Sequence, residues 1–389
     1  MVSEPLISAT ILFALIVLGE IISYLTKARV PMLLTAMVSY LLLSWAGVLP
    51  EKILDNAILP SLGALIIAPV IMHMGTMMPL HILKSQWKAV VISILGILGS
   101  TTLILVFVTL LFDFRTAASG VGPIAGGIVA LLITVEKLQD LGLANLIVLP
   151  AIVQALQGVI GMPLSSILMK RYSKYYLANR HTDKNVANIS NKNESKKETI
   201  FNKNPLLQNN VIRLFIMFFL ASIAFMIGEV TGIHFTLVSL LFGVIGLKIG
   251  LFEQKELEHN QSFTIMMVII ILIVIGSMGG IKPHDLWEFL PAILSILVIG
   301  TIGILIGGFI GAKLIGWKPT KALPVALTAL YGFPGDFILC EEVSRSVTDN
   351  EEDREDVFNE LLSPMIIGGF TTVTVASVIL TSILMNFIK

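Results

Sequence analysis

Long runs of apolar residues recur along the whole chain and are separated by short polar segments. Each run is about twenty residues long, which is the length that an α-helix needs to cross the hydrocarbon core of a bilayer. Two further runs, at 122–140 and 322–340, are interrupted by glycine and proline. We therefore predict an all-α integral membrane protein whose ten spans fall at 6–26, 30–49, 58–80, 88–112, 145–169, 211–231, 233–252, 262–281, 286–312 and 361–388.

Composition agrees with this class. The 389 residues are 55% hydrophobic and only 13% charged, whereas soluble domains are about 25% charged. Mean hydropathy is +0.89. The first run follows Glu4 without a basic segment, so we expect a retained span rather than a cleaved signal peptide. The single cysteine, Cys340, excludes a disulfide within the chain and a cysteine-rich metal site.

Charged residues are concentrated in two segments. Residues 170–210 carry nine lysines and arginines against three acids, and residues 341–360 carry nine carboxylates against two arginines. The basic segment is a predicted linker between two membrane regions of similar length, 1–169 and 211–389.

These two regions match each other in order, which predicts an internal repeat. Two of the matches have nearly the same offset, 204 and 205 residues, although chance similarity between apolar segments remains an alternative. The matching pairs are LGEII (18–22) with IGEVT (227–231), HMGTMMPLHIL (73–83) with SMGGIKPHDLW (277–287), and GPIAGGIVALLITVEK (122–137) with LTALYGFPGDFILCEE (327–342).

Charge also predicts the topology, because cytoplasmic loops carry an excess of lysine and arginine. The basic linker lies on the cytoplasmic side only if the interrupted run at 122–140 does not cross the membrane completely. Each repeat then has five transmembrane helices and one re-entrant or broken segment, and the two repeats are inverted. We expect a multi-pass protein of the cell (inner) membrane with the linker in the cytoplasm and both chain ends outside.

The two interrupted segments are the predicted binding site. Irregular backbone at membrane depth is tolerated where it lines a cavity, and paired broken segments in two repeats indicate a transporter's substrate site. Glycines allow the backbone to turn and to approach a ligand. The predicted substrate-binding residues are Gly126, Gly127, Gly332, Phe333 and Gly335, with Gln157 and Thr371 on the last span of each repeat.

Acidic residues near these segments are candidates for ion coupling. Asp336 follows the second interruption, where a carboxylate at mid-membrane costs about 2.5–3.5 kcal/mol. We expect Asp336 to bind Na⁺ or accept a proton, with a helix-capping role as the alternative. Glu136 and Glu341 correspond in the two repeats and are further ion-coupling candidates, although both also fit a solvated helix face, as does Glu342.

The pattern resembles the sodium/glutamate symporters and the related sodium-coupled 2-hydroxycarboxylate transporters. The resemblance covers the architecture of the whole chain. The Gly-Gly-X-Gly type signature of those families is reduced here to the pair Gly126-Gly127, and GFPG at 332–335 lacks the pair. The resemblance implies a homodimer in which a mobile transport domain moves against a scaffold like an elevator. It also implies a small anionic substrate, with glutamate or a hydroxy- or dicarboxylate as examples, carried with Na⁺.

Other function classes fit the sequence less well. A cation/proton antiporter that uses Asp336 is the main alternative. An intramembrane enzyme is disfavoured because the chain has no H-E-x-x-H helix, no G-x-S-x-G turn and no Walker loop. The six histidines have no metal-ligand spacing, so we expect no resident cofactor. A sensor or scaffold gives no reason for two broken segments, and nothing indicates a nucleic-acid partner.

Overall fold

A computed structural model describes residues 4–77, 86–143, 146–187, 209–233 and 235–388, and these residues form helices and no strands. The first half contains α1 (Pro5–Leu25), α2 (Met32–Trp45), α3 (Ile53–Asn56), α4 (Leu59–Thr76), α6 (Trp87–Leu103), η1 (Ile104–Val108), α7 (Thr109–Leu111), α8 (Phe114–Ala125), α9 (Ile128–Asp140) and α10 (Val148–Ala187). The second half contains α12 (Asn210–Thr231), α13 (Phe235–Ile249), α14 (Glu256–His259), α15 (Phe263–Gly276), η4 (Ser277–Gly280), α16 (Pro283–Ile315), α17 (Pro319–Leu327), η5 (Thr328–Leu330), α18 (Gly332–Val347), α19 (Glu351–Phe370), η6 (Thr371–Ala376) and α20 (Ser377–Met385).

A helix occupies each of the ten predicted spans. Among the described residues, seven helical segments are long and apolar enough to cross a membrane, and α2, α13 and α15 are shorter apolar helices of 14 or 15 residues. The chain is therefore an all-helical, multi-pass membrane protein.

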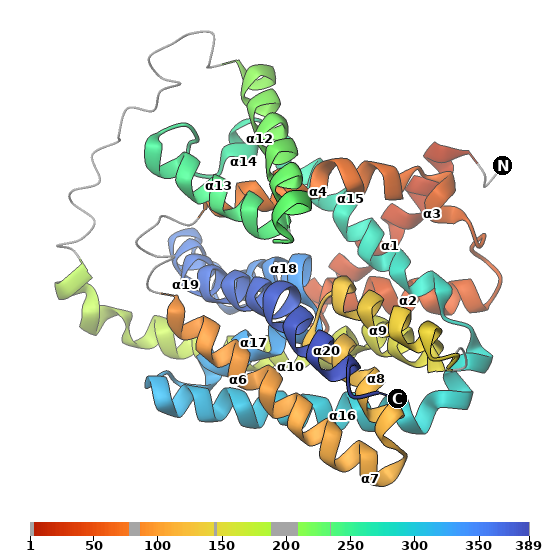
Figure 1. Cartoon of the computed structure of the whole chain (residues 1–389). Helices are drawn as coiled ribbons and strands as arrows, with labels where there is room; N and C mark the ends of the chain where they lie inside the picture. The colour runs from red at the N-terminus through yellow and green to blue at the C-terminus, as the bar shows by residue number, and fades with distance from the viewer. Residues whose placement is uncertain (1–3, 78–85, 144–145, 188–208, 234, 389) are drawn as a thin grey trace.

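Two long helices, α6 and α16, pack against each other along the lower edge of Figure 1. Glycines on both helices bring the two backbones close together. A Cβ atom added to Gly303 would lie 2.5 Å from the Cα atom of Ser100, and one added to Gly99 would lie 3.1 Å from the Cα atom of Gly307. Small residues are common at helix crossings in membrane proteins. Lipid is as apolar as the side chains, so helices associate through close backbone packing rather than through the hydrophobic effect.

The remaining helices pack as two groups. We call α1, α2, α4, α12, α13 and α15 the outer group, because they contact one another mainly through the pairs α1–α2, α4–α13, α12–α13 and α4–α15. The inner group comprises α6–α10 and α16–α20, in which α10 contacts α8, α16, α17 and α18. Both Gly/Pro-interrupted segments belong to the inner group.

The two charged segments are largely helical, and only the first of them differs from the prediction. Helix α10 continues through Ala187, so the first part of the predicted linker at 170–210 is helical; residues 188–208 lie outside the described part of the chain. The acidic segment at 341–360 comprises the end of α18 and the start of α19, with residues 348–350 between the two helices. Asn350 caps α19 by accepting a hydrogen bond from the backbone N–H of Asp353, and the acids of the first turn favour the positive end of the helix dipole.

Candidate functional site

The first interruption is a tight helical hairpin. Helices α8 and α9 are joined by Gly126 and Gly127, whose φ angles are +98° and +97°. Residues that carry a side chain rarely adopt such positive φ angles, so glycine is needed at both positions. The chain then folds back, so that α9 lies against α8. A Cβ atom added to Gly122 in α8 would lie 3.1 Å from the carbonyl oxygen of Ala130 in α9.

Asp113 fixes the other end of α8. Its carboxylate accepts hydrogen bonds from the backbone N–H and the hydroxyl of Thr116, at 2.9 Å and 2.7 Å. Slight desolvation raises the pKa of Asp113, but these hydrogen bonds and the charge of Arg115 outweigh it and hold the pKa below its ordinary value. The hairpin therefore begins at an N-cap that is strongest when it is ionised.

The second interruption is longer and is tied to a neighbouring helix. Helix α17 is followed directly by the 3-10 helix η5. The chain then bends through Tyr331, Gly332 (φ +53°) and Phe333, after which α18 is regular. The hydroxyl of Tyr331 donates to the Ser165 hydroxyl of α10 at 2.8 Å. Gly161 of α10 lies close to the same bend, because an added Cβ atom would be 3.0 Å from the Tyr331 ring.

Both interruptions meet at Val373, in the π-helical segment η6. A Cβ atom added to Gly127 would overlap the carbonyl oxygen of Val373, and one added to Gly332 would lie 2.9 Å from the Val373 Cγ2 atom. A Cβ atom added to Gly126 would lie 2.9 Å from the carbonyl oxygen of Ala329 in η5. We call these five residues the junction. Segments about 200 positions apart in the sequence are thus brought together at one place.

Asp336 lies next to the junction in the first turns of α18 and is completely buried. One carboxylate oxygen, Oδ1, accepts from the backbone N–H of Phe337 at 2.7 Å. The other, Oδ2, has no hydrogen-bond partner among the described residues. It faces Gly369 of α19, where an added Cβ atom would lie 2.6 Å away. A buried carboxylate with a free oxygen is costly unless a proton or a cation satisfies it.

Gln157 and Thr371 flank this region in different ways. Gln157 is buried on α10, and its Oε1 atom has no partner within the described structure. It shares a helix face with Gly161, four residues later, which faces the bend at Tyr331. The Thr371 hydroxyl instead donates to the carbonyl of Ile367 in its own helix at 2.6 Å.

Phe333 and Gly335 shape the second bend itself. The Phe333 ring stacks on Phe370, with ring centroids 6.4 Å apart. Gly335 leaves room for Met162 of α10, because an added Cβ atom would lie 3.2 Å from the Met162 Cε atom.

Glu136 and Glu341 are not brought to the junction. Both side chains are exposed. Glu136 is nine residues beyond Gly127 on α9, which corresponds to about 13 Å along the helix axis. Their exposure fits the solvated face that the sequence left open as an alternative.

Glu342 corrects the expectation of a solvated acid. Its side chain is buried, with 3% exposed, and its Oε1 atom accepts the backbone N–H of Met32, the first residue of α2, at 2.7 Å. One turn further along α18, Arg345 forms an ion pair with Glu20 of α1 at 2.5 Å. The last turns of α18 therefore attach the inner group to the outer group.

The sequence offered no sign that Val373 makes these contacts, because the polar residues that stand out there are its neighbours Thr371, Thr372 and Thr374. Nor did it separate Glu342 from its exposed neighbour Glu341. A helical reading of 332–347 would have placed Glu342 on a different face from Asp336, since the two differ by six positions.

No protein-family model matches the chain, and no curated protein matches it. The described residues contain no group of three or more His, Cys, Asp or Glu side chains that could hold a metal ion.

Proposed function

We propose that this protein is a secondary active transporter that moves a small carboxylate together with Na⁺, and that the junction is its binding site. The observation that carries this proposal is the position of Asp336. It is a fully buried carboxylate with one unsatisfied oxygen, and it lies where two helix interruptions meet. Ionisable residues within membrane segments are expensive and mark ion or substrate pathways in most cases.

The interruptions supply groups for both a cation and an anion. Helices α8 and η5 end at the breaks and direct carbonyl groups toward them, while α9 and α18 begin there and direct N–H groups toward them. Carbonyl oxygens and the Asp336 carboxylate suit Na⁺, and helix N-termini suit a carboxylate. Coupled binding of a cation and an anion follows from this arrangement, because each ion offsets the charge of the other.

The substrate carboxylate has few basic partners here. Among the described residues, Arg213 is the only buried lysine or arginine. It lies on α12, in the outer group, and pairs with Glu256 at the start of α14. A substrate at the junction is therefore held by backbone N–H groups, by the Gln157 amide and by the bound cation, rather than by an arginine.

The order of helices supports the two-repeat arrangement. In the first half, the elements follow in the order α1, α2, α4, α6, hairpin and α10. In the second half, the corresponding order is α12, α13, α15, α16, bend and α19–α20. We propose that the two repeats are inverted and that the inner group moves against the outer group in an elevator-type cycle. Cytoplasmic placement of the linker and a homodimer remain part of this proposal.

A cation/proton antiporter is the second candidate. The same observation favours it, because a buried carboxylate without a basic partner is able to exchange a proton for a cation. In that case the junction binds no carboxylate, and Asp336 alone carries the exchange.

Transport by purified protein in liposomes separates these functions. We expect an inward Na⁺ gradient to drive uptake of one labelled small carboxylate, and we expect Asp336→Asn to abolish it while Glu341→Gln retains it. Proton release coupled to Na⁺ entry, without any carboxylate uptake, would instead identify the antiporter. Uptake by Asp336→Asn at the wild-type rate would contradict both assignments.

A further inference from the structure

Four basic side chains lie at one end of the inner group, toward the left of Figure 1, where α10 leaves its apolar stretch and α16 turns into α17. They are Arg171 and Lys174 on α10, Lys313 on the last turn of α16, and Lys318 directly before α17. All four are exposed. We call these four residues the basic patch.

The basic patch is assembled from two segments that are distant in the sequence. Arg171 and Lys174 are three positions apart and share an exposed face of α10 with Tyr175. From the other segment, the Nζ atom of Lys318 lies 3.1 Å from the centre of the Tyr175 ring. Helix α10 packs against both α16 and α17. The cations of the two segments therefore lie on one surface.

No acidic side chain neutralises the basic patch. Within the described part of the chain, none of its four residues forms an ion pair. The stretches 148–182 and 289–335 contain no aspartate or glutamate. Glu360 of α19 approaches α10, but it already accepts a hydrogen bond from the Tyr172 hydroxyl at 2.6 Å and pairs with Lys321. The positive charge of this surface is thus available to an anion.

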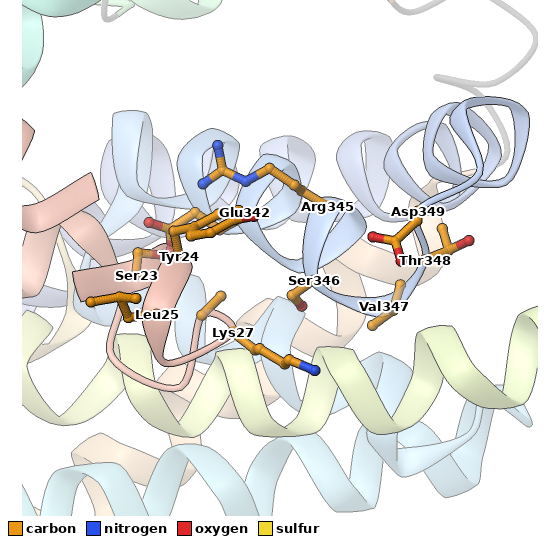
Figure 2. A pocket seen from close by; sticks show the side chains of 11 residues that line it. Ser23, Tyr24, Leu25, Lys27, Glu342, Arg345, Ser346, Val347, Thr348 and Asp349 are labelled. Carbon is orange, nitrogen blue, oxygen red and sulfur yellow. The ribbon is translucent and has the colours of Figure 1, made fainter. Parts of the chain in front are cut away.

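A neighbouring cavity differs from the basic patch in its charge. Lys27, in the turn between α1 and α2, lines this cavity together with Glu342, Arg345 and Asp349, as Figure 2 shows. Acidic and basic side chains alternate there, and Arg345 is paired with Glu20. The excess of positive charge is therefore confined to the surface formed by α10, α16 and α17.

Exposed apolar side chains adjoin the basic patch on both helices. Ile167 lies one turn before Arg171 on α10, and Ile310 lies one turn before Lys313 on α16. These apolar residues belong to membrane-crossing helices, so they face lipid. A surface with cations directly beyond lipid-facing residues matches a phospholipid, in which the charged headgroup adjoins the acyl chains.

We propose that the basic patch binds the headgroup of an anionic phospholipid from the surrounding membrane, such as phosphatidylglycerol. Lysine and arginine donate charge-assisted hydrogen bonds to phosphate oxygens, while the acyl chains pack on the exposed apolar residues. The patch lies on the linker side of the protein, which the proposed topology places in the cytoplasm, where the leaflet is rich in anionic lipid. A lipid bound there connects α10 to α16 and α17 and stabilises this end of the inner group.

Thermal unfolding of the purified full-length protein in detergent tests this surface without a transported substrate. Dioleoylphosphatidylglycerol is titrated into the micelles, with dioleoylphosphatidylcholine as the lipid without net charge, since a ligand that binds the native state raises the unfolding temperature. We expect phosphatidylglycerol to stabilise wild-type protein more than phosphatidylcholine does. The triple variant Arg171→Gln/Lys174→Gln/Lys318→Gln should weaken the apparent affinity for phosphatidylglycerol at least about tenfold, because each cation near an anionic lipid surface contributes about fivefold.

Basic residues at the ends of spans also determine topology, so the control must remove equal charge elsewhere. Lys52→Gln/Lys248→Gln/Lys282→Gln does this at three exposed lysines that lie outside the patch and far apart in the sequence. We expect this control to keep the wild-type response to phosphatidylglycerol. A response lost equally in both triple variants would reflect total charge and would overturn a defined lipid site.

Two further measurements secure the test. Lys318 packs on Tyr175, so Arg171→Gln/Lys174→Gln replaces the triple variant if that variant fails to fold; it should weaken the phosphatidylglycerol response severalfold. Glycerol 3-phosphate carries the anionic group without acyl chains, and it should not stabilise the protein at the lipid concentrations used.

The lipid site is overturned if phosphatidylglycerol and phosphatidylcholine stabilise wild-type protein equally, or if the patch variant that folds responds like wild type. It is also overturned if glycerol 3-phosphate stabilises the protein as phosphatidylglycerol does, since the surface would then bind a soluble anion. Asp336→Asn should retain the full lipid response. If Asp336→Asn transports normally while the patch variant loses that response, the junction proposal fails and the lipid site stands.

Discussion

The two interruptions of the inner group reach the same residue, Val373, by different means. The first is a pair of glycines in a hairpin, and it brings no charged side chain to the junction. The second is the bend through Tyr331, Gly332 and Phe333, with Asp336 three residues later. It is tied to α10 by the Tyr331 hydroxyl and to α1 and α2 through the end of α18.

This difference assigns different roles to the two halves of the proposed repeat. At the offset of 205 residues, Asp336 corresponds to Leu131. The first hairpin therefore contributes backbone groups, and the second contributes backbone groups and the charge. In the proposed repeat, both copies therefore contain a break, and only the second copy carries a buried carboxylate beside it.

The largest effect should come from removing that charge. We expect Asp336→Asn to reduce Na⁺-driven uptake at least about 100-fold, because roughly 2.7 kcal/mol or more is lost with one charge-assisted contact in a buried site. Uptake into liposomes measures this directly. The corresponding change in the first hairpin, Leu131→Asn, should leave some coupled uptake, and a loss as complete as that of Asp336→Asn would contradict the asymmetry.

Asp336→Asn should not lower the thermal stability of the protein, although it lowers uptake. Asp336 has no basic partner among the described residues, so its removal relieves an uncompensated charge. In the absence of Na⁺, we expect Asp336→Asn to unfold at the same temperature as wild type or at a higher one. A marked decrease would mean that Asp336 is a structural residue with an ion partner of its own.

The two glycine positions should differ in cost. Gly127→Ala combines a strained φ angle with overlap on the Val373 carbonyl, and we expect it to lower the free energy of unfolding by about 3 kcal/mol. Gly332→Ala meets only the Val373 side chain and should cost about 1–2 kcal/mol. Thermal unfolding measures both.

Gly142→Ala is the matched control, since its φ angle is +70° but nothing lies within 4 Å of an added Cβ atom. It should cost only the backbone strain, about 1 kcal/mol. Equal costs for Gly127→Ala and Gly142→Ala would contradict close contact at the junction. For transport, both Gly127→Val and Gly332→Val should be impaired.

The sequence predicted the positions of the apolar helices and of both interruptions, although three of those helices are shorter than a full membrane span. Apolar length decides whether a helix can cross a bilayer, and Gly126, Gly127 and Gly332 are read directly as positions where a helix breaks. It failed where charge was read as a sign of solvent. Glu342 was expected to be solvated with its acidic neighbours, yet it is buried because the first N–H of α2 provides a partner.

Contacts between apolar segments that are distant along the chain could not be predicted from the sequence either. Val373 is one of many β-branched residues, and only tertiary packing distinguishes it from Val375 or Val378. The extension of α10 to Ala187 was missed because its basic residues suggested a linker. In the structure, Tyr172 donates to Glu360 and Lys318 lies 3.1 Å above the Tyr175 ring, so this stretch packs against other helices.

A smaller effect should follow from uncapping the first hairpin. Asp113→Ala removes two hydrogen bonds from the start of α8 and should cost about 1–2 kcal/mol in thermal unfolding. The pKa of Asp113 is lowered in the folded state, so its stabilisation is complete above the ordinary pKa of an aspartate and is lost as pH falls through the lowered pKa.

Asp113→Asn keeps the capping geometry, since asparagine is a good N-cap, and should remove only this dependence on acid pH. If wild type and Asp113→Asn lose stability in parallel between neutral pH and pH 3, the charge of this cap contributes nothing.

The smallest effect concerns the tether of the second bend. Tyr331→Phe removes the hydrogen bond to Ser165 and should lower the free energy of unfolding by about 1 kcal/mol. Tyr24→Phe, at an exposed tyrosine, should change nothing. Equal unfolding temperatures for the two variants would show that the Tyr331 hydroxyl does not hold the bend in place.

Ligand-induced thermal stabilisation of the purified protein tests the junction most directly. A panel of small carboxylates is measured with Na⁺ and with K⁺, for wild type and for Asp336→Asn. We predict that one carboxylate stabilises wild type only when Na⁺ is present, and that Asp336→Asn loses this combined response. Equal carboxylate stabilisation of both proteins, or none in wild type, would contradict a coupled binding site at the junction.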